Sequence, residues 1–280
     1  MKLLAMTCCC VDVYPHSGEI HPGGNALNIA ADWALQGNRI LSHPSCRERE
    51  LTIRLLGATG DDEYGACIRK SISMLPIDAD SLHIMDDVTA NHHICIDENG
   101  DRYFEPDAWT GGAFEHYRLS GSDSEVIASS DVVVITFNDP NLGSVLELRQ
   151  DPSHPFRLAV DFQETRDFEP WLAFLPLIDV FFLSGNASVL GELEAWSHTS
   201  DAMYIATLGA EGSVLFHRGK THRMGAVPVK EVVDTTGCGD AWLAAFLLAN
   251  QAGLELEEAM RAGADASAVV IRHPGGFRIP

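Results

Sequence analysis

Short apolar runs alternate with amphipathic stretches along the second half of the chain. The runs over residues 131–136, 156–160 and 179–183 are bounded by turn-forming residues and predict strands. The intervening stretches 142–149 and 168–175 have a helical pattern. Such alternation is typical of βαβ units, and strands that are apolar throughout favour a parallel sheet covered by helices on both faces. The predicted fold class is therefore α/β.

Three polar segments depart from this alternation. Residues 88–105 hold a turn-rich centre, Asp97–Asp101, between two extended stretches, which predicts a hairpin. Residues 11–22 also read as extended and lead into a Pro-Gly-Gly turn. We expect these two segments to combine into a small lid sheet on a single domain that spans residues 1–280. The polar residues 39–54 predict an exposed loop.

Composition and charge narrow the class of protein. A hydrophobic content of 46% supports a large core, and a formal net charge of −21 would repel nucleic acids and acidic membrane surfaces. No apolar run is long enough to span a bilayer, and residues 1–13 read as an apolar strand rather than a secretion signal. Seven cysteines without framework spacing predict reduced thiols. We expect a cytoplasmic protein that binds neither nucleic acid nor membrane.

The strongest chemical motif is Asp234-Thr-Thr-Gly-Cys-Gly-Asp240, which precedes a run of helix-forming residues. Backbone amides of Gly237, Cys238 and Gly239 at a helix N-terminus would form an anion site suited to phosphate. A carboxylate beside such a site suits a general base in phosphoryl transfer, so Asp240 is the candidate catalytic residue. The alternative is that Asp240 only caps the helix.

Two further glycine-containing segments are weaker signals. Gly23-Gly-Asn-Ala-Leu-Asn28 precedes a helical pattern, and an amide at Asn28 suits sugar hydroxyls, although an ordinary turn would read the same way. Thr207-Leu-Gly-Ala-Glu-Gly212 joins two strands and suits either a nucleotide loop or a plain hairpin. Asp161 follows a strand, where it could help to bind phosphate or metal or could cap a helix.

In this order, the three glycine-containing segments resemble those of the ribokinase-like (PfkB) carbohydrate kinase family. Gly57-Ala-Thr-Gly-Asp-Asp-Glu-Tyr-Gly65 is similar to a fourth family segment, so the resemblance covers nearly the whole chain. It implies a three-layer sandwich with a mostly parallel sheet and a small β lid. It also implies ATP and Mg²⁺ as cofactors, a sugar as substrate, a homodimer formed through the lid, and an open question of a monovalent cation near Asp234.

The resemblance also assigns roles to individual residues. Asp240 matches the general base, and Gly237, Cys238 and Gly239 match the anion hole. The residues that match substrate and nucleotide contacts are, for the sugar, Asp12, Gly24, Asn28 and Arg102, and for the nucleotide, Thr207, Gly209, Gly212 and Asn186. No residue is assigned as a protein metal ligand.

Two positions depart from the family pattern. Cys238 stands where alanine is usual, and Val189 stands where the family segment that begins at Asn186 has a glutamate. Within the family, residues 10–15 and 23–28 are similar to enzymes that phosphorylate fructoselysine. The sequence therefore predicts ATP-dependent phosphorylation of a ketose-type hydroxyl, on fructoselysine or fructose. A nucleoside kinase and a non-catalytic sugar or nucleotide sensor are the alternatives.

Overall fold

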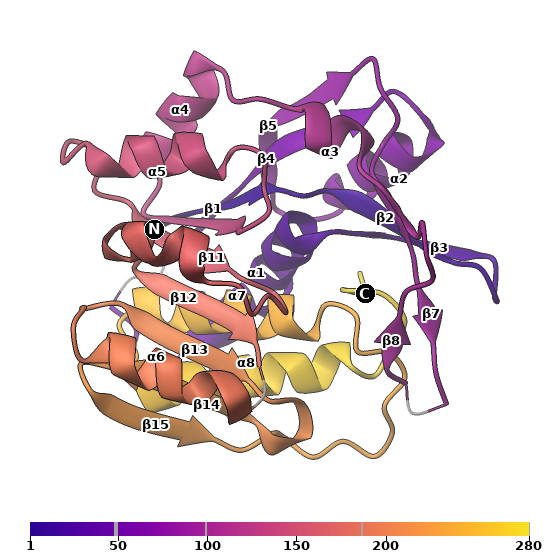
Figure 1. Cartoon of the computed structure of the whole chain (residues 1–280). Helices are drawn as coiled ribbons and strands as arrows, with labels where there is room; N and C mark the ends of the chain where they lie inside the picture. Colours follow the sequence, from indigo (N-terminus) through magenta and orange to yellow (C-terminus); the bar gives the residue numbers. More distant parts are fainter. Residues whose placement is uncertain (48–49, 99, 186, 280) are drawn as a thin grey trace.

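A nine-stranded sheet forms the centre of the computed structural model, which describes residues 1–47, 50–98, 100–185 and 187–279 (Figure 1). The strand order is β15-β14-β13-β12-β11-β10-β1-β4-β5. All pairs from β13 to β5 are parallel, whereas β13 with β14 and β14 with β15 pair antiparallel. The strands are β1 (Lys2–Thr7), β4 (Thr52–Gly60), β5 (Asp78–Met85), β10 (Val132–Thr136), β11 (Arg157–Asp161), β12 (Val180–Ser184), β13 (Met203–Thr207), β14 (Ser213–His217) and β15 (Lys220–Met224).

Helices cover both faces of this sheet, which makes three layers (Figure 1). One core cluster joins the sheet to α1 (Asn25–Leu41), α2 (Glu63–Ile72), α7 (Cys238–Gln251) and α8 (Leu256–Val270). The other joins it to α3 (Gly112–His116), α4 (Gly121–Ala128), α5 (Leu142–Gln150), α6 (Leu190–Ser197) and the 3₁₀ helix η1 (Glu169–Leu177). The two remaining 3₁₀ turns are η2 (Ala187–Val189) and η3 (Gly209–Glu211). Residues along β1 alternate between the two clusters, which is why this strand is apolar throughout.

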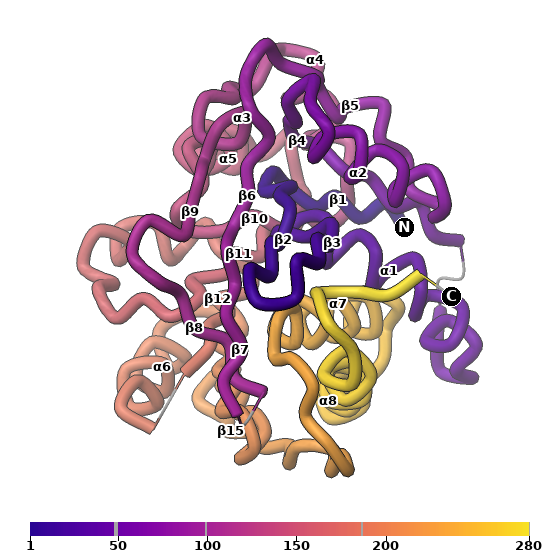
Figure 2. The backbone as a smooth tube through the Cα atoms, turned by 90° about the vertical axis from the view of Figure 1, so that its right-hand side faces the viewer, coloured from indigo at the N-terminus to yellow at the C-terminus, as the bar shows by residue number. Residues whose placement is uncertain are grey.

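A second, four-stranded sheet lies beside the central sheet and forms the lid (Figure 2). Its order is β3-β2-β6-β9, from β2 (Cys10–Tyr14), β3 (Glu19–Gly23), β6 (Asn91–His93) and β9 (Trp109–Thr110). The hairpin of β7 (Cys95–Ile96) and β8 (Arg102–Tyr103) extends it. The predicted α/β class and the small lid sheet are confirmed. The parallel pairing of β2 with β6 and the contribution of β9 were not predicted.

Two local predictions need refinement. The helical pattern of 168–175 corresponds to the 3₁₀ helix η1, which contains Pro170 and Pro176, and neither proline can donate a backbone hydrogen bond. The predicted loop 39–54 is shorter, because α1 continues to Leu41 and β4 starts at Thr52. The side chain of Cys46 between them is buried rather than exposed.

The structure bears on two further expectations. None of the seven cysteines, all of which the structure describes, forms a disulfide. Within the described residues, no helix is both long and apolar enough to cross a membrane.

Candidate active site

The segment 234–240 turns sharply into the first turn of α7. Gly237 has a φ of 75°, a left-handed conformation that glycine adopts at little cost. A Cβ atom here would collide with the backbone of Gly276, so the turn packs closely against the C-terminal segment. α7 begins at Cys238, and Asp240 therefore lies in its first turn.

Asp240 is held by two amide side chains from the first turn of α1. Asn28 donates from Nδ2 to Asp240 Oδ2 at 2.8 Å, and Asn25 donates from Nδ2 to Asp240 Oδ1 at 2.8 Å. The side chain of Asp240 is only 7% exposed. Burial raises its pKa, while the two amides and the positive charge of Arg102 oppose the rise. The carboxyl is thus fixed in direction and is more basic than an exposed aspartate.

Backbone amides at the start of α7 directly precede or belong to Asp240. In the part of the chain that the structure describes, the amides of Gly237, Gly239 and Asp240 have no hydrogen-bond acceptor, whereas the Cys238 amide donates to Thr235 O at 3.2 Å. Free amides at the positive end of a long helix form an anion site. Burial raises the pKa of the Cys238 thiol to about 12, so it adds no negative charge there.

Other buried carboxyls lie near Asp240. Asn25 Nδ2 also donates to Asp161 Oδ2 at 3.3 Å, so one amide bridges Asp240 and Asp161. The pKa values of Asp12 and Asp161 are raised to about 7, chiefly by burial, and the negative charge of Asp240 contributes to both shifts. The positive charge of Arg102 opposes all three shifts. The site is therefore a buried group of carboxyls that the positive charge of Arg102 influences.

The lid strand β2 faces the segment 234–240. Tyr14 donates from its hydroxyl to Asp234 Oδ2 at 2.6 Å, and Asp234 also accepts from the amides of Thr236 and Gly275. Asp12, two residues earlier on β2, points to the same side, because alternate residues share a face of a strand. A Cβ atom on Gly23 would collide with its carboxylate.

Two of the predicted sugar contacts have unused acceptor atoms. Among the described residues, Asp12 Oδ2 and Asn28 Oδ1 have no hydrogen-bond partner, although both side chains are buried. Gly24 has a φ of 91°, and a Cβ atom on it would collide with the carbonyl oxygen of Cys8. Glycine at this position therefore lets the start of α1 lie close to the segment that precedes β2. Arg102 lies on β8, with its backbone amide 3.3 Å from Thr235 Oγ1. Hydroxyl groups of a ligand can satisfy such unused acceptors.

The predicted nucleotide loop lies at the end of β13. Thr207 pairs with Ser184 on β12, and the nearest side-chain atom to a Cβ atom on Gly239 would be Ser184 Oγ at 3.7 Å. The loop therefore lies one strand away from the anion site. Gly209 and Gly212 have φ values of 57° and 93° around the turn η3.

The segment associated with the missing glutamate is only partly described. Asn186, a predicted nucleotide contact, lies outside the described residues. Val189 ends the short turn η2 and is buried in the core. The position of the family glutamate is thus taken by a packing residue in this chain.

Two other polar residues are explained by local structure. Asp62 caps α2 by accepting from the Gly65 amide, and it accepts two further hydrogen bonds from Thr89. It therefore ties the start of the lid to the main domain. Asp161 Oδ1 accepts from the Gln163 amide at 2.8 Å, which forms a local turn, while Oδ2 faces Asn25.

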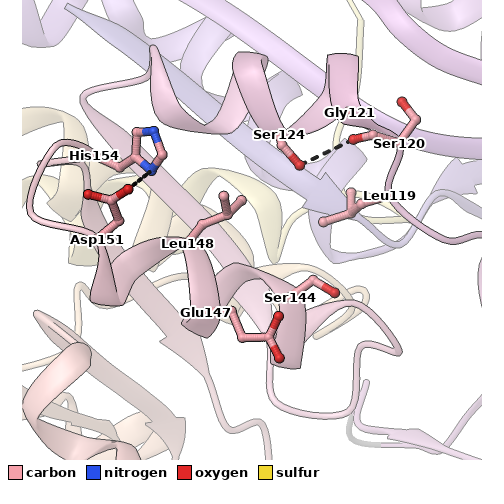
Figure 3. Close-up of a pocket in the computed structure, with 9 residues that line it drawn as sticks. All are labelled: Leu119, Ser120, Gly121, Ser124, Ser144, Glu147, Leu148, Asp151 and His154. Carbon is pink, nitrogen blue, oxygen red and sulfur yellow. Dashed lines mark hydrogen bonds and ion pairs between the residues drawn. The ribbon is translucent and has the colours of Figure 1, made fainter.

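A hollow of about 440 Å³ lies between α4 and α5, away from these residues (Figure 3). Its lining is polar, and it includes Glu147, Asp151 and His154. It contains none of the predicted site residues.

Magnesium fits this site as a companion of the nucleotide. Within residues 1–47, 50–98, 100–185 and 187–279, no group of three or more His, Cys, Asp or Glu side chains is arranged to hold a metal ion. Mg²⁺ in phosphoryl-transfer sites is held largely by substrate phosphates and water, with few protein ligands.

Sequence reasoning missed Asn25, which holds both Asp240 and Asp161. A signal was present, because this amide directly precedes the predicted helix after Gly23-Gly24. Read alone, however, it is an ordinary turn residue.

Curated proteins similar to this chain are sugar-derivative kinases. The fructoselysine 6-kinase of Shigella flexneri is 28% identical over 277 residues, which cover 96% of each chain. The fructosamine kinase of Bacillus subtilis (strain 168) is 27% identical and covers 99% of this chain and 93% of its own.

Solved structures show the same fold at lower identity. Ribokinase from Arabidopsis thaliana, complexed with ribose and ATP, has a TM-score of 0.75 and 20% identity and covers 98% of this chain and 93% of its own. Adenosine kinase from Sinorhizobium meliloti has a TM-score of 0.76 and 21% identity and covers 100% and 96%.

The model of the pfkB carbohydrate kinase family matches residues 9–148 and 183–278. This match covers most of the chain, including Asp12 and the start of α7, while Asp161 lies between the two matched segments. The resemblance inferred from the glycine-containing segments is confirmed. The chain belongs to the pfkB family of carbohydrate kinases and is a phosphotransferase of the sugar-kinase type.

Proposed function

We propose that the protein transfers the γ-phosphoryl group of ATP to a primary hydroxyl of a ketose derivative, with a fructosamine such as fructoselysine as the preferred acceptor. The observation that carries the reaction is the Asp240 carboxylate, held by Asn25 and Asn28 beside free amides at the start of α7. The choice of acceptor rests on the curated relatives.

Asp240 acts as the general base. Its raised pKa makes it a better proton acceptor than an exposed aspartate, and its two amide partners hold both oxygens in one orientation. As the sugar hydroxyl attacks the γ-phosphorus, its proton passes to Asp240 and ADP leaves. Burial of the carboxyl keeps water from replacing the sugar hydroxyl.

The free amides of Gly237, Gly239 and Asp240 stabilise the negative charge of the transferred phosphoryl group. They point along the positive end of the 14-residue helix α7, where an anion is favoured. The Cys238 side chain does not take part in binding the phosphoryl group, because burial keeps its thiol protonated and uncharged. Mg²⁺ bound to the ATP phosphates would supply further charge neutralisation at this centre.

Substrates bind on the two sides of this centre. Asp12 and Asn28 accept hydrogen bonds from sugar hydroxyls, and Gly24 keeps the start of α1 close to the sugar. Arg102 contacts the sugar from the lid. Thr207, Gly209, Gly212 and Asn186 contact the nucleotide. A monovalent cation near Asp234 remains a prediction, and the Asp234 side chain already accepts hydrogen bonds from Tyr14, Thr236 and Gly275.

A nucleoside kinase is the second candidate, and one observation favours it. An aromatic lid would suit a nucleobase, and the lid carries Phe104 and Trp109 beside His92. A nucleobase stacks on such rings. The sensor alternative lacks such support, since Asp240 and its two amide partners are all present.

The test is ADP release from Mg·ATP with fructose, fructoselysine, ribose, 2-keto-3-deoxygluconate and adenosine. Asp240→Asn should lower kcat by about 10²–10⁴-fold while sugar binding, measured by calorimetry, is retained. Asp80→Asn, an exposed carboxylate on β5, is the matched control and should keep full turnover. Wild-type turnover in Asp240→Asn would refute the base assignment, and a preference for adenosine would select the second candidate.

A further inference from the structure

Three lid strands carry side chains in one row beside the acceptor pocket. Asp12 on β2 is in register with His92 on β6, and His92 is in register with Trp109 on β9. Residues in register on neighbouring strands project from the same face of a sheet. Because Tyr14, on the same face of β2, bonds to Asp234, this is the face toward α7. His92 and Trp109 therefore share the face that carries Asp12.

Aromatic rings form an accessible surface along this row, which we call the aromatic shelf (His92, Phe104 and Trp109). The Phe104 ring stacks on His92 with centroids 4.1 Å apart and planes 8° apart, and Trp109 meets the His92 ring edge-on at 5.4 Å. Phe104 is 46% exposed and Trp109 is 36% exposed. Trp109 is fixed by a hydrogen bond from Nε1 to Glu115 Oε1 at 2.8 Å. The shelf is thus ordered and only partly covered.

Opposite charges flank the shelf. Asp12, at the sugar side, has an unused carboxylate oxygen and is 4% exposed. The Arg102 guanidinium lies 5.7 Å from the Phe104 ring centroid, and it makes no ion pair in the described part of the chain. A ligand that reaches along the shelf would therefore meet a carboxylate first, apolar rings next and a cation beside them.

We propose that the aromatic shelf and Arg102 bind the amino-acid arm of a ketosamine acceptor. The nitrogen on the sugar's first carbon lies toward Asp12, the methylene groups of the arm lie on Phe104 and Trp109, and its carboxylate pairs with Arg102. This subsite rests on the proposed function, because it extends the same acceptor pocket beyond the sugar.

The arrangement fits such an arm better than a nucleobase. A base needs a free ring face, and one face each of His92 and Phe104 is already taken by their mutual stacking. Methylene groups can also pack on the exposed edges of the rings, where a base cannot stack. Burial lowers the pKa of His92 to about 4, so a neutral ring faces the ammonium nitrogen of the substrate.

The test compares kcat/KM for fructoselysine, N-butyl-fructosamine, which lacks the carboxylate, and fructose, which lacks the arm. The wild type should prefer fructoselysine to fructose by at least about tenfold. Phe104→Ala and Trp109→Ala should reduce that preference by about five- to tenfold. Arg102→Gln should lower the value for fructoselysine relative to N-butyl-fructosamine by a similar factor.

Tyr103→Ala is the matched control, because Tyr103 is 45% exposed between Arg102 and Phe104 but projects from the opposite face of β8. It should change the values for all three acceptors by the same factor. Sedimentation velocity of each variant reports whether a second copy covers the shelf.

Each contrary result would lead to a different conclusion. Equal kcat/KM for fructose and fructoselysine, or equal losses on both in Phe104→Ala, would overturn the subsite and leave the ketose kinase intact. Conversion of a dimer to a monomer by Phe104→Ala would assign the shelf to a second copy of the chain and overturn the proposal. Turnover of adenosine alone would overturn the subsite together with the proposed function.

Discussion

Asn28 on α1 donates to the carboxylate of Asp240 on α7 across 2.8 Å, which joins the first turns of two helices separated by 212 positions in the chain. Asn25 holds the other oxygen of the same carboxylate. The general base is therefore positioned by α1, the helix whose first turn also carries the predicted sugar contacts. Sugar binding and base orientation are coupled through this helix.

Replacing Asn28 by alanine should lower the fraction of Asp240 that is ionised, and so able to accept a proton, at neutral pH. The Asn28 hydrogen bond favours the charged carboxylate, so its loss raises the pKa of Asp240 further. The acid limb of the kcat/KM profile should move to higher pH, and turnover at pH 7 should fall by about tenfold or more. The profile of ADP formation against pH checks this.

The control is Asn38→Ala on the exposed side of the same helix. It should leave the pH profile unchanged. An unshifted acid limb in Asn28→Ala would separate Asn28 from the ionisation of Asp240.

Replacing Gly237 by alanine should damage the anion site. The left-handed φ of 75° and the close backbone of Gly276 leave no room for a Cβ atom, and such strain costs about 1–3 kcal/mol. The turn must shift to relieve it, which displaces the free amides. We expect kcat to fall by about tenfold or more, with a lower melting temperature.

Gly143→Ala is the comparison for that experiment, since a Cβ atom there would lie in open space on α5. It should leave both activity and melting temperature near those of the wild type. Full activity in Gly237→Ala would show that the turn tolerates a side chain and would contradict the close packing.

Tyr14→Phe should loosen the lid from the main domain. The lost hydroxyl donates to Asp234 at 2.6 Å and accepts from the Gly275 amide at 3.2 Å. Leaving a buried partner unsatisfied costs about 1–3 kcal/mol, and urea unfolding measures this loss. Tyr64→Phe is the control, because the described residues include no hydrogen-bond partner for its hydroxyl; equal stability losses in both would refute the role of the Tyr14 hydroxyl.

Local patterns in the sequence predicted the parallel strands and the glycine turn at the start of α7. Uninterrupted apolar runs such as Val132–Thr136 are typical of strands buried on both faces. The segment Gly237-Cys-Gly-Asp240 before an apolar helix strongly favours a tight turn into that helix. These features depend on neighbours in the chain.

The missed features depend instead on long-range pairing. The bond from Asn25 to Asp240 spans 215 positions, and no local pattern encodes it. The row of Asp12, His92 and Trp109 requires the register of three strands, and the lid prediction stopped at residue 105, before β9. The segment 168–175 carries a helical apolar pattern, and such a pattern does not distinguish a 3₁₀ helix from an α-helix.

The buried Asp161 should make the free protein less stable as pH rises. Its folded-state pKa is raised from 3.8 to about 7, chiefly by burial, so the folded state binds this proton more tightly than the unfolded state. Between about pH 4 and pH 7 the folded state therefore holds more protons, and the free energy of unfolding falls as pH increases. Asp161→Asn removes this dependence while its Oδ1 can still accept from Gln163.

Melting temperatures at pH 5 and pH 8 test this effect. Relative to the wild type, Asp161→Asn should gain at least about 1 kcal/mol at pH 8, or about 2 °C, and little at pH 5. Asp151→Asn is a control of opposite sign. Hydrogen bonds from Ser153 lower the pKa of the exposed Asp151. Its stabilisation of the folded state is therefore present at neutral pH and is lost as pH falls through the folded-state pKa. If Asp161→Asn instead lost stability at pH 8, the Asp161 carboxylate would have to be ionised and favourably paired in the folded protein.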